Sequence, residues 1–532
     1  MRRRQAIIGF CLLLVLVFMW GTAAEAIYLN KEKTFSVTGR VETKLTVTTR
    51  GYTGWYTVPS MVPDQPNSPN LASFNLKQHR TLAYIEGNYN FKPGSGYDIR
   101  VHATGRFLYE GVYEYGPDSA QAVRDFNSKY RDEIDDFSRD ADLWEGYVDI
   151  SKGPFFLRLG RQKISWGETD VYPMLDRIMP IDNTYGGIFE DLDDRRIPIW
   201  ALRTTYNFGK VGMFNNLGAE LFWEPAMIDQ KFSPQAPFGS IYNFPQPSAP
   251  PYQIGPHPDS SIEESRWGVR LEGVLGNNFN WSLAYMLTYL TDPALKSVVD
   301  LDLVFAGDLH GLQMQKYWEQ VHIVGGSFSF FEQFTSTIIR GELGYFIDEP
   351  AFQISKNFAA LGTFLYVSDP ASGIPPDQWG SLIPKSSIPE WNVLRFSIAV
   401  DRPFWVRFLN DKAMFSTTVE IFNEYYPSHT DDSVLPAPVY PSAKFVELHE
   451  WEQTIVALVT TNYMQGTLTP TVVAGFNPRE GGAGFYTVSL EKRFGNHWKL
   501  KGEYNDVWGN KEIPPGVLFD WDQVAVRATY MF

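Results

Sequence analysis

Cysteine is nearly absent from this chain of 532 residues. The one cysteine, Cys11, lies in an apolar run near the start, inside a segment that we expect to be removed. Disulfide bonds, thiolate metal sites and cysteine nucleophiles are therefore excluded from the mature protein. The cysteine pair that attaches c-type haem is missing as well, and no cofactor or metal site is predicted.

Long hydrophobic runs and an excess of positive charge are also missing. After residue 26, no apolar run approaches the length of about 18 residues that a transmembrane helix needs. The chain carries 46 Lys and Arg against 61 Asp and Glu, which argues against nucleic acid as a partner. The histidines are scattered and form no HExxH pair or local nucleophile arrangement, so we do not expect an enzyme.

The first 26 residues have the three parts of a secretory signal peptide. A basic start (MRRRQ) precedes an apolar run, and small residues follow at Ala24 and Ala26. We place cleavage after Ala26. An uncleaved anchor helix is the alternative, although the run is short for a membrane span. The mature chain, 27–532, would then be an exported protein with a net charge of −17.

The mature chain is rich in segments that alternate between apolar and polar residues. In 97–109 (YDIRVHATGRFLY), Tyr97 and Val101 fall on one face, and Arg100 and Arg106 fall on the other. This run is longer than the 5–6 residues, roughly, of a soluble strand, and long enough for a tilted membrane strand of about 9–11. It therefore predicts a strand that spans an outer membrane.

Strands of this kind recur along the chain, and we count about 18, with about 16 as the main competitor. Short turns such as KPGSG and FGNH alternate with long connections that hold most of the proline. This alternation is typical of a barrel with long outer loops and short periplasmic turns. The sequence predicts an all-β fold: one transmembrane antiparallel β-barrel over 27–532, embedded in the lipids of the outer membrane of a Gram-negative bacterium.

The predicted barrel encloses a lumen whose polar residues would set which solutes pass. The strand pattern places eight arginines on the inner face: Arg100, Arg106, Arg158, Arg203, Arg270, Arg340, Arg395 and Arg527. One interpretation is a wall that favours anions or carboxylates. The other is that these arginines pair with neighbouring acidic residues and only fill the lumen.

The third outer loop, 161–197, is unusually apolar for a loop in water. We expect it to fold into the lumen and narrow it. The candidate constriction residues are Arg161, Gln162, Trp166, Gly167, Glu168, Asp170, Asp176, Arg177, Pro180 and Asp182. The acidic run from Glu190 to Asp194 lacks the spacing of a calcium loop, so a solvated turn is favoured over a metal site.

The second outer loop has a helical pattern. Val123, Phe126, Tyr130, Ile134 and Phe137 recur at helical spacing, which predicts a short amphipathic helix over the barrel rim. We favour a packed cap over a moving lid.

The stretch RLGRQKISWG, followed by DRIMPID, resembles an uncharacterised family of Gram-negative outer-membrane proteins, a domain of unknown function. It is also similar, more distantly, to the alginate-export type of 18-stranded barrel, which has a similar Gly-Arg-Gln strand end. The matching positions are Gly160, Arg161, Gln162, Trp166, Gly167, Pro180 and Asp182. The resemblance implies a channel without established catalytic residues, which in some members is proposed to work with inner-membrane permeases.

The chain ends in VAVRATYMF, which predicts a closing strand that pairs with the strand near 35–47. Tyr530 and Phe532 resemble the C-terminal aromatic signal that the outer-membrane assembly machinery reads. We therefore expect an outer-membrane channel or porin, with a lumen lined by arginine and acidic residues and narrowed by an infolded loop. The alternative is a loop-plugged barrel that acts as a docking or export component with a periplasmic or inner-membrane partner.

Overall fold

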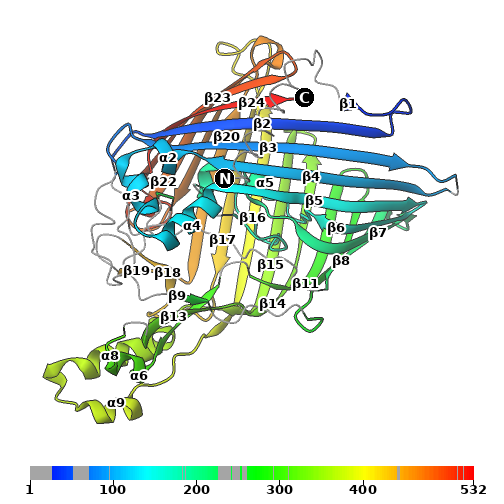
Figure 1. Ribbon diagram of the computed structural model, residues 1–532. Helices are drawn as coiled ribbons and strands as arrows, with labels where there is room; N and C mark the ends of the chain where they lie inside the picture. Colours follow the sequence, from blue (N-terminus) through cyan, green and yellow to red (C-terminus); the bar gives the residue numbers. More distant parts are fainter. Residues whose placement is uncertain are drawn as a thin grey trace.

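The protein, seen in a computed structural model, is a closed antiparallel β-barrel (Figure 1). The structure describes residues 27–51, 71–94, 96–182, 184–185, 187–225, 236, 241–242, 252–254, 261–290, 293–308, 311–439, 444–511, 513–518 and 521–532. The predicted signal peptide, 1–26, lies outside the described residues, as does most of the proline-rich fourth outer loop.

Eighteen strands within the described residues form the barrel wall. They are β2 (Phe35–Thr48), β3 (Leu76–Phe91), β4 (Asp98–Glu110), β5 (Arg139–Lys152), β6 (Phe155–Gln162), β7 (Ile199–Val211), β8 (Phe214–Glu224), β10 (Arg266–Leu275), β11 (Phe279–Tyr289), β14 (Gln320–Glu332), β15 (Thr337–Pro350), β16 (Glu390–Phe404), β17 (Phe415–Tyr425), β20 (Trp451–Thr460), β21 (Leu468–Asn477), β22 (Ala483–Phe494), β23 (Trp498–Gly509) and β24 (Gln523–Met531). A two-residue strand, β1 (Ile27–Tyr28), is added to β2.

The ring closes between the last strand and the first. β24 pairs antiparallel with β2, and Lys44 lies opposite Arg527 in that pairing. Closure leaves none of the 18 described wall strands at an open edge, which a barrel in lipid requires because unpaired backbone groups are costly there. The predicted all-β barrel of 18 strands is confirmed, and the competing count of 16 is wrong.

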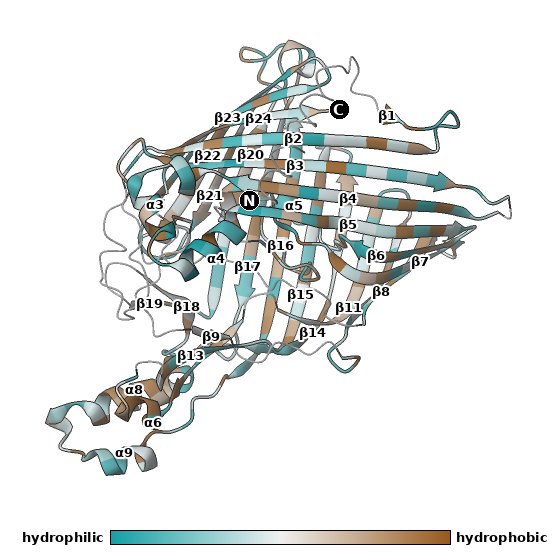
Figure 2. Cartoon of the chain, in the orientation of Figure 1, coloured by the Kyte–Doolittle hydropathy of each residue, from teal (hydrophilic) through white to brown (hydrophobic). Residues whose placement is uncertain are grey.

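The wall has one polar and one apolar face because side chains alternate along each strand. Figure 2 shows hydrophilic and hydrophobic residues alternating along many of these strands. In β4, His102, Thr104 and Arg106 are buried, whereas Val101, directly before His102 and on the opposite face, is exposed. Leucine and valine are exposed in the same way around much of the ring, for example at Leu283. An apolar outer face on a closed barrel is the face that contacts lipid.

The connections between barrel strands alternate in length, as the sequence predicted. Short turns follow β3, β5, β7, β10, β14, β20 and β22, and a connection of intermediate length (405–414) follows β16. Longer connections follow the other strands, except for the short one (478–482) after β21. β2 begins and β24 ends at the end of the barrel that carries the short turns. That end is the periplasmic end of an outer-membrane barrel, and the long connections are the outer loops.

The helix predicted in the second outer loop is split. The structure has α2 (Val112–Tyr115), α3 (Asp118–Arg124) and α4 (Ser128–Ser138). Asn127 starts a new helix because its side chain accepts a hydrogen bond from the Tyr130 N–H at 3.0 Å. Tyr130 and Ile134 are buried as the pattern indicated, but Phe126 is exposed at the break.

Other outer loops contain elements that the sequence pattern did not predict. These are α5 (Leu192–Arg195), α6 (Leu301–Phe305), α7 (Ile354–Asn357), α8 (Ala359–Ser368), α9 (Pro376–Leu382) and short strands β9 (Tyr252–Ile254), β12 (Ala294–Val299), β13 (Leu312–Tyr317), β18 (Val434–Val439) and β19 (Lys444–Glu447). Figure 1 shows α6, α8 and α9 as an arm that projects from the outer end of the barrel. No helix in the described part of the chain is long and apolar enough to cross a membrane.

Candidate functional site

The third outer loop, 161–197, is tied to wall strands by hydrogen bonds. Trp166 Nε1 donates to Glu220 Oε1 on β8 at 2.8 Å, and the two side chains are almost completely buried. Farther along, Glu342 on β15 accepts from the Glu168 N–H at 2.7 Å and also from the Leu175 N–H. A strand carboxylate that receives two loop N–H groups fixes the backbone of the loop, not only a side chain.

Apolar packing joins the same part of the loop to the wall. Ile164, Trp166, Leu175 and Ile178 are buried to 1% exposure or less. They share one cluster with wall residues on β8, β11, β14, β15 and β16: Phe222, Ala284, Met286, Val321, Ile323, Phe346, Trp391 and Val393. These wall residues face the inside of the barrel and not the lipid. The loop that packs on them therefore lies inside the barrel and not over its rim.

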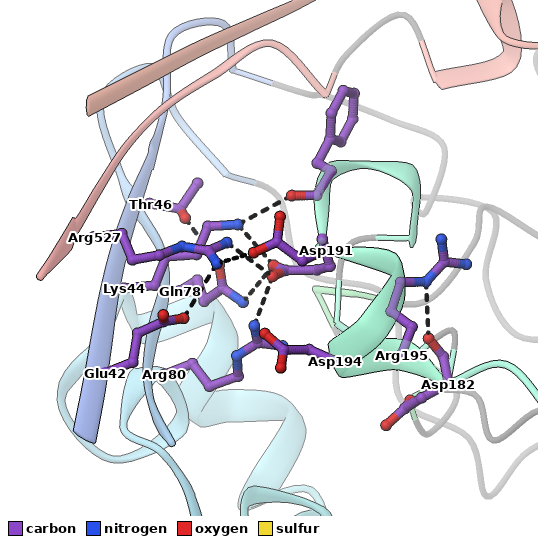
Figure 3. A network of polar contacts seen from close by, with 12 residues as sticks. Glu42, Lys44, Thr46, Gln78, Arg80, Asp182, Asp191, Asp194, Arg195 and Arg527 are labelled. Carbon is purple, nitrogen blue, oxygen red and sulfur yellow. Dashed lines mark hydrogen bonds and ion pairs between the residues drawn. The ribbon is translucent and has the colours of Figure 1, made fainter. Parts of the chain in front are cut away.

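The far end of the loop reaches the seam where the barrel closes (Figure 3). Glu190 pairs with Lys44 on β2 at 2.8 Å and with Arg80 on β3 at 2.6 Å. Arg527 on β24 lies 3.6 Å from the same carboxylate and pairs with Asp191 at 2.5 Å. The loop therefore crosses the interior, because the seam strands and β15 lie on opposite sides of the ring.

The charges around Glu190 favour its ionised form. Burial alone would raise the pKa of Glu190, but the nearby positive charges of Arg80, Lys44 and Arg527 hold that pKa well below its ordinary value. The solvated turn favoured from the sequence is wrong for Glu190, which is buried among these cations. No cluster of three or more His, Cys, Asp or Glu able to hold a metal occurs among the described residues.

The candidate constriction residues are held by contacts within the loop and with the wall. Arg161 pairs with Asp142 (2.8 Å), Gln162 Nε2 donates to the Ala201 carbonyl (2.7 Å), Asp170 pairs with Arg340, Asp176 accepts from Ser165 Oγ (2.5 Å) and from Arg196 (3.1 Å), the Pro180 carbonyl accepts from the Ile197 N–H (2.9 Å), and Asp182 accepts from the Thr184 N–H (2.9 Å). Burial raises the pKa of Asp176 against the effect of these donors. Their role in narrowing the lumen stays a prediction.

Two glycines of the loop region permit close approach. Gly160 has a φ of 131°, and a Cβ there would lie 2.2 Å from the Gly146 carbonyl oxygen on β5. A Cβ on Gly167 would lie 3.0 Å from Glu342 Oε2 and from Asp176 Cβ. Both glycines belong to the motif quoted above, so that motif marks where the chain leaves β6 and turns inward.

The eight predicted lumen arginines are engaged in polar pairs. Acidic partners are Asp140 for Arg106, Asp149 for Arg158, Glu220 for Arg203 and Arg270, Asp401 for Arg340, Glu349 for Arg395 and Glu42 for Arg527. Arg100 donates to Asn90 Oδ1 at 3.0 Å. Pairing with acids offsets the positive charge of most of these side chains. Anion selectivity of this wall stays a prediction.

Sequence reasoning did not single out the wall residues that anchor the loop: Lys44 and Arg80 at the seam, and Glu220 on β8. A signal existed for Lys44, because Glu42, Lys44 and Thr46 give β2 one polar face. What the pattern did not reveal is the partner. Lys44 and Glu190 are 146 residues apart, and only the path of the loop brings them together.

Two cavities are lined jointly by this loop and the wall. The first has a volume of about 220 Å³ and lies toward the turn end, where Glu168 faces Arg270, Glu272 and a group of serines on β11 and β14. The second has a volume of about 270 Å³ and lies at the outer end, where Arg177 faces Trp391 and Tyr426. One residue of the loop therefore lines each of these two cavities.

Comparison with known protein families identifies the chain. The model described as "Protein of unknown function (DUF1302)" matches residues 7–532. The chain belongs to this DUF1302 family. The resemblance noted in the 160–182 motif is thereby confirmed over nearly the whole chain, and the protein is an outer-membrane β-barrel. No curated protein matches it.

Several solved structures are similar to this DUF1302 protein over most of its length. OccAB4 of Acinetobacter baumannii is 7% identical, with a TM-score of 0.45 and coverage of 96% of this chain and 100% of that one. OccK1 (OpdK) of Pseudomonas aeruginosa is 8% identical, with a TM-score of 0.43 and coverage of 93% and 98%. The outer-membrane channel DcaP of Acinetobacter baumannii is 9% identical, with a TM-score of 0.38 and coverage of 96% and 100%. At such values these proteins say nothing about the solute of this chain.

Proposed function

We propose that this DUF1302 protein is an outer-membrane channel for small solutes, and that loop 161–197 is its constriction. The observation that carries the proposal is the path of the loop, from Trp166 at Glu220 on β8 to Glu190 at the seam. A solute that enters from outside meets the Arg177 cavity first and the Glu168 cavity after the loop. Constriction by an infolded loop limits solute size while the wall strands stay unchanged.

Conductance measurements in planar bilayers test this proposal. Purified wild-type protein should give discrete conductance steps, and deletion of residues 168–192 should enlarge them because it removes the segment that crosses the interior. Deletion of 359–382 provides a matched control, because α8 and α9 lie on the arm outside the barrel (Figure 1). That deletion should leave the step size unchanged. Folded wild-type protein without steps would refute an open channel, and equal steps in both deletions would refute the constriction.

A second candidate function is a loop-plugged barrel that docks a periplasmic or inner-membrane permease. The observation that favours it is the apolar cluster that Ile164, Leu175 and Ile178 share with the wall. This candidate predicts a folded barrel that does not conduct alone. It also predicts that a permease co-purifies with the full chain after cross-linking in intact cells. In the presence of that permease, the 168–192 deletion should not create large conductance steps.

A further inference from the structure

The outer cavity combines an apolar wall with one arginine whose buried Nε has no hydrogen-bond partner. Its lining includes Phe352, Trp391, Tyr426, Val434 and Leu448, all of which are at most 8% exposed. The rings of Trp391 and Tyr426 meet edge to face, with centroids 6.2 Å apart. Walls of this composition bind the non-polar part of a small ligand, because its transfer from water to the cavity is favourable.

Arg177 is the loop residue that reaches this cavity. Its Nε is buried and has no hydrogen-bond partner, although the charges of Glu424 and Asp176 act on the guanidinium. A buried donor on a cation without a partner is costly, and an anion that supplies oxygen acceptors would remove that cost. Arginine presents parallel N–H groups that match a carboxylate in particular.

The other charged groups of the cavity are already paired. Arg395 forms a bidentate pair with Glu349, at 2.5 and 2.7 Å, and donates through Nε to Glu424 at 3.0 Å. Glu424 also accepts from the Tyr426 hydroxyl at 2.5 Å. These hydrogen bonds engage both acids, so they fix the wall and leave the buried Arg177 Nε–H as the donor that has no acceptor.

We infer that this cavity binds a small amphipathic monocarboxylate, whose carboxylate pairs with Arg177 and whose aromatic or short alkyl part packs on Trp391 and Tyr426. A volume of about 270 Å³ suits a single ring or a short chain. The site lies where a solute arriving from outside first meets the loop. The inference names a solute class for the proposed channel and rests on that function for its role in uptake.

Fluorine NMR of 4-fluorobenzoate with the full-length barrel in detergent tests the inference. Wild-type protein should broaden the signal saturably, and unlabelled benzoate should reverse the broadening. The neutral isostere 4-fluorobenzamide should bind at least about tenfold more weakly, because it lacks the charge that Arg177 recognises. Equal binding of the two probes would overturn the inference without the need for any variant.

Two substitutions separate the cation from the apolar wall. Arg177→Gln should weaken 4-fluorobenzoate binding at least about tenfold, whereas Arg131→Gln, on the exposed side of α4, should not change it. Trp391→Ala should weaken 4-fluorobenzoate but not inorganic phosphate. If phosphate competes as well as benzoate, the cavity is a general anion site and the proposed ligand class is wrong.

The result of the binding measurement is independent of the conductance experiment. Carboxylate binding by a barrel that does not conduct would support the site and refute the channel. Conductance without Arg177-dependent binding would refute the site and leave the channel standing.

Discussion

Lys44 of β2 and Glu190 of the third outer loop form an ion pair of 2.8 Å in which the side chains are 1% and 3% exposed. Arg80 of β3 and Arg527 of β24 approach the same carboxylate. The first two strands and the last strand of the barrel therefore share one anion, and that anion belongs to a loop that starts after β6. The same contact closes the seam electrostatically and fixes the loop across the interior.

Replacement of this anion should destabilise the barrel. Glu190→Gln leaves Lys44 and Arg80 buried without their charge partner, and loss of one member of a buried pair costs about 3–5 kcal/mol. Urea unfolding of the purified barrel, followed by tryptophan fluorescence, measures this loss. Asp193→Asn is the matched control, because the Asp193 side chain, three residues farther along on α5, is 85% exposed. Equal unfolding midpoints for the two variants would contradict the role assigned to Glu190.

The stability that Glu190 provides should depend on pH in one direction. The pKa of Glu190 is lowered in the folded barrel, so its contribution is complete above the ordinary glutamate pKa of about 4.3 and is lost as pH falls toward the folded value. The free energy of unfolding of wild type minus that of Glu190→Gln should be constant from neutral pH down to about 5 and smaller at about pH 3. A difference that grows on acidification would show that Glu190 is not held ionised.

Ion selectivity should respond in opposite directions to the two members of one wall pair. Arg340 Nε donates to Asp401 Oδ2 at 2.9 Å, so the pair adds no net charge. Asp401→Asn should shift the reversal potential in a salt gradient toward anions, and Arg340→Gln should shift it toward cations. Asp377→Asn on α9 should leave it unchanged. Identical reversal potentials for all variants would place this pair outside the conducting path.

The strands were predictable because their signal is local. A period of two over 97–109 predicted β4 to within one residue at each end, and alternation alone assigned Val101 and Arg106 to opposite faces. The 18-strand count followed because loop lengths gave an independent check on it. Alternation likewise assigned the eight arginines to the inner face, and their lining of the lumen and their effect on selectivity stay predictions.

The contacts of the loops were not predictable because their partners are distant in sequence. Trp166 and Glu220 are 54 residues apart, and the sequence around either residue does not indicate that the other is its partner. The apolar composition of 161–197 indicated an inward path but not its anchors. In the second outer loop the apolar spacing continued through Phe126, but the Asn127 side chain starts a new helix there. The arm with α8 gave no amphipathic signal, because its sequence AALGTFLYVS is apolar on most faces.

Phe532 is part of the predicted assembly signal, and its position on the barrel allows that role to be tested. The backbone of Phe532 exchanges two hydrogen bonds of 3.0 Å with Gly39 on β2. A Cβ on Gly39 would lie 2.3 Å from the Phe532 ring, so Gly39 leaves the space that the ring occupies. We propose that the assembly machinery reads this ring together with Tyr530. Phe532→Ala should then lower the amount of folded barrel in the outer membrane several-fold, whereas the refolded protein should be no less stable than Gly39→Ala.

Gly39→Ala separates recognition from packing. It displaces the Phe532 ring from its place on the wall but keeps the aromatic residue at the end of the chain. If the ring acts as a signal, this variant should reach the outer membrane at wild-type levels, with a lower unfolding midpoint as its only defect. If the ring acts by packing, both variants should lose the same stability and the same amount of assembled protein. Heat-modifiable migration of outer-membrane fractions, measured beside urea unfolding of the refolded barrels, distinguishes the two results.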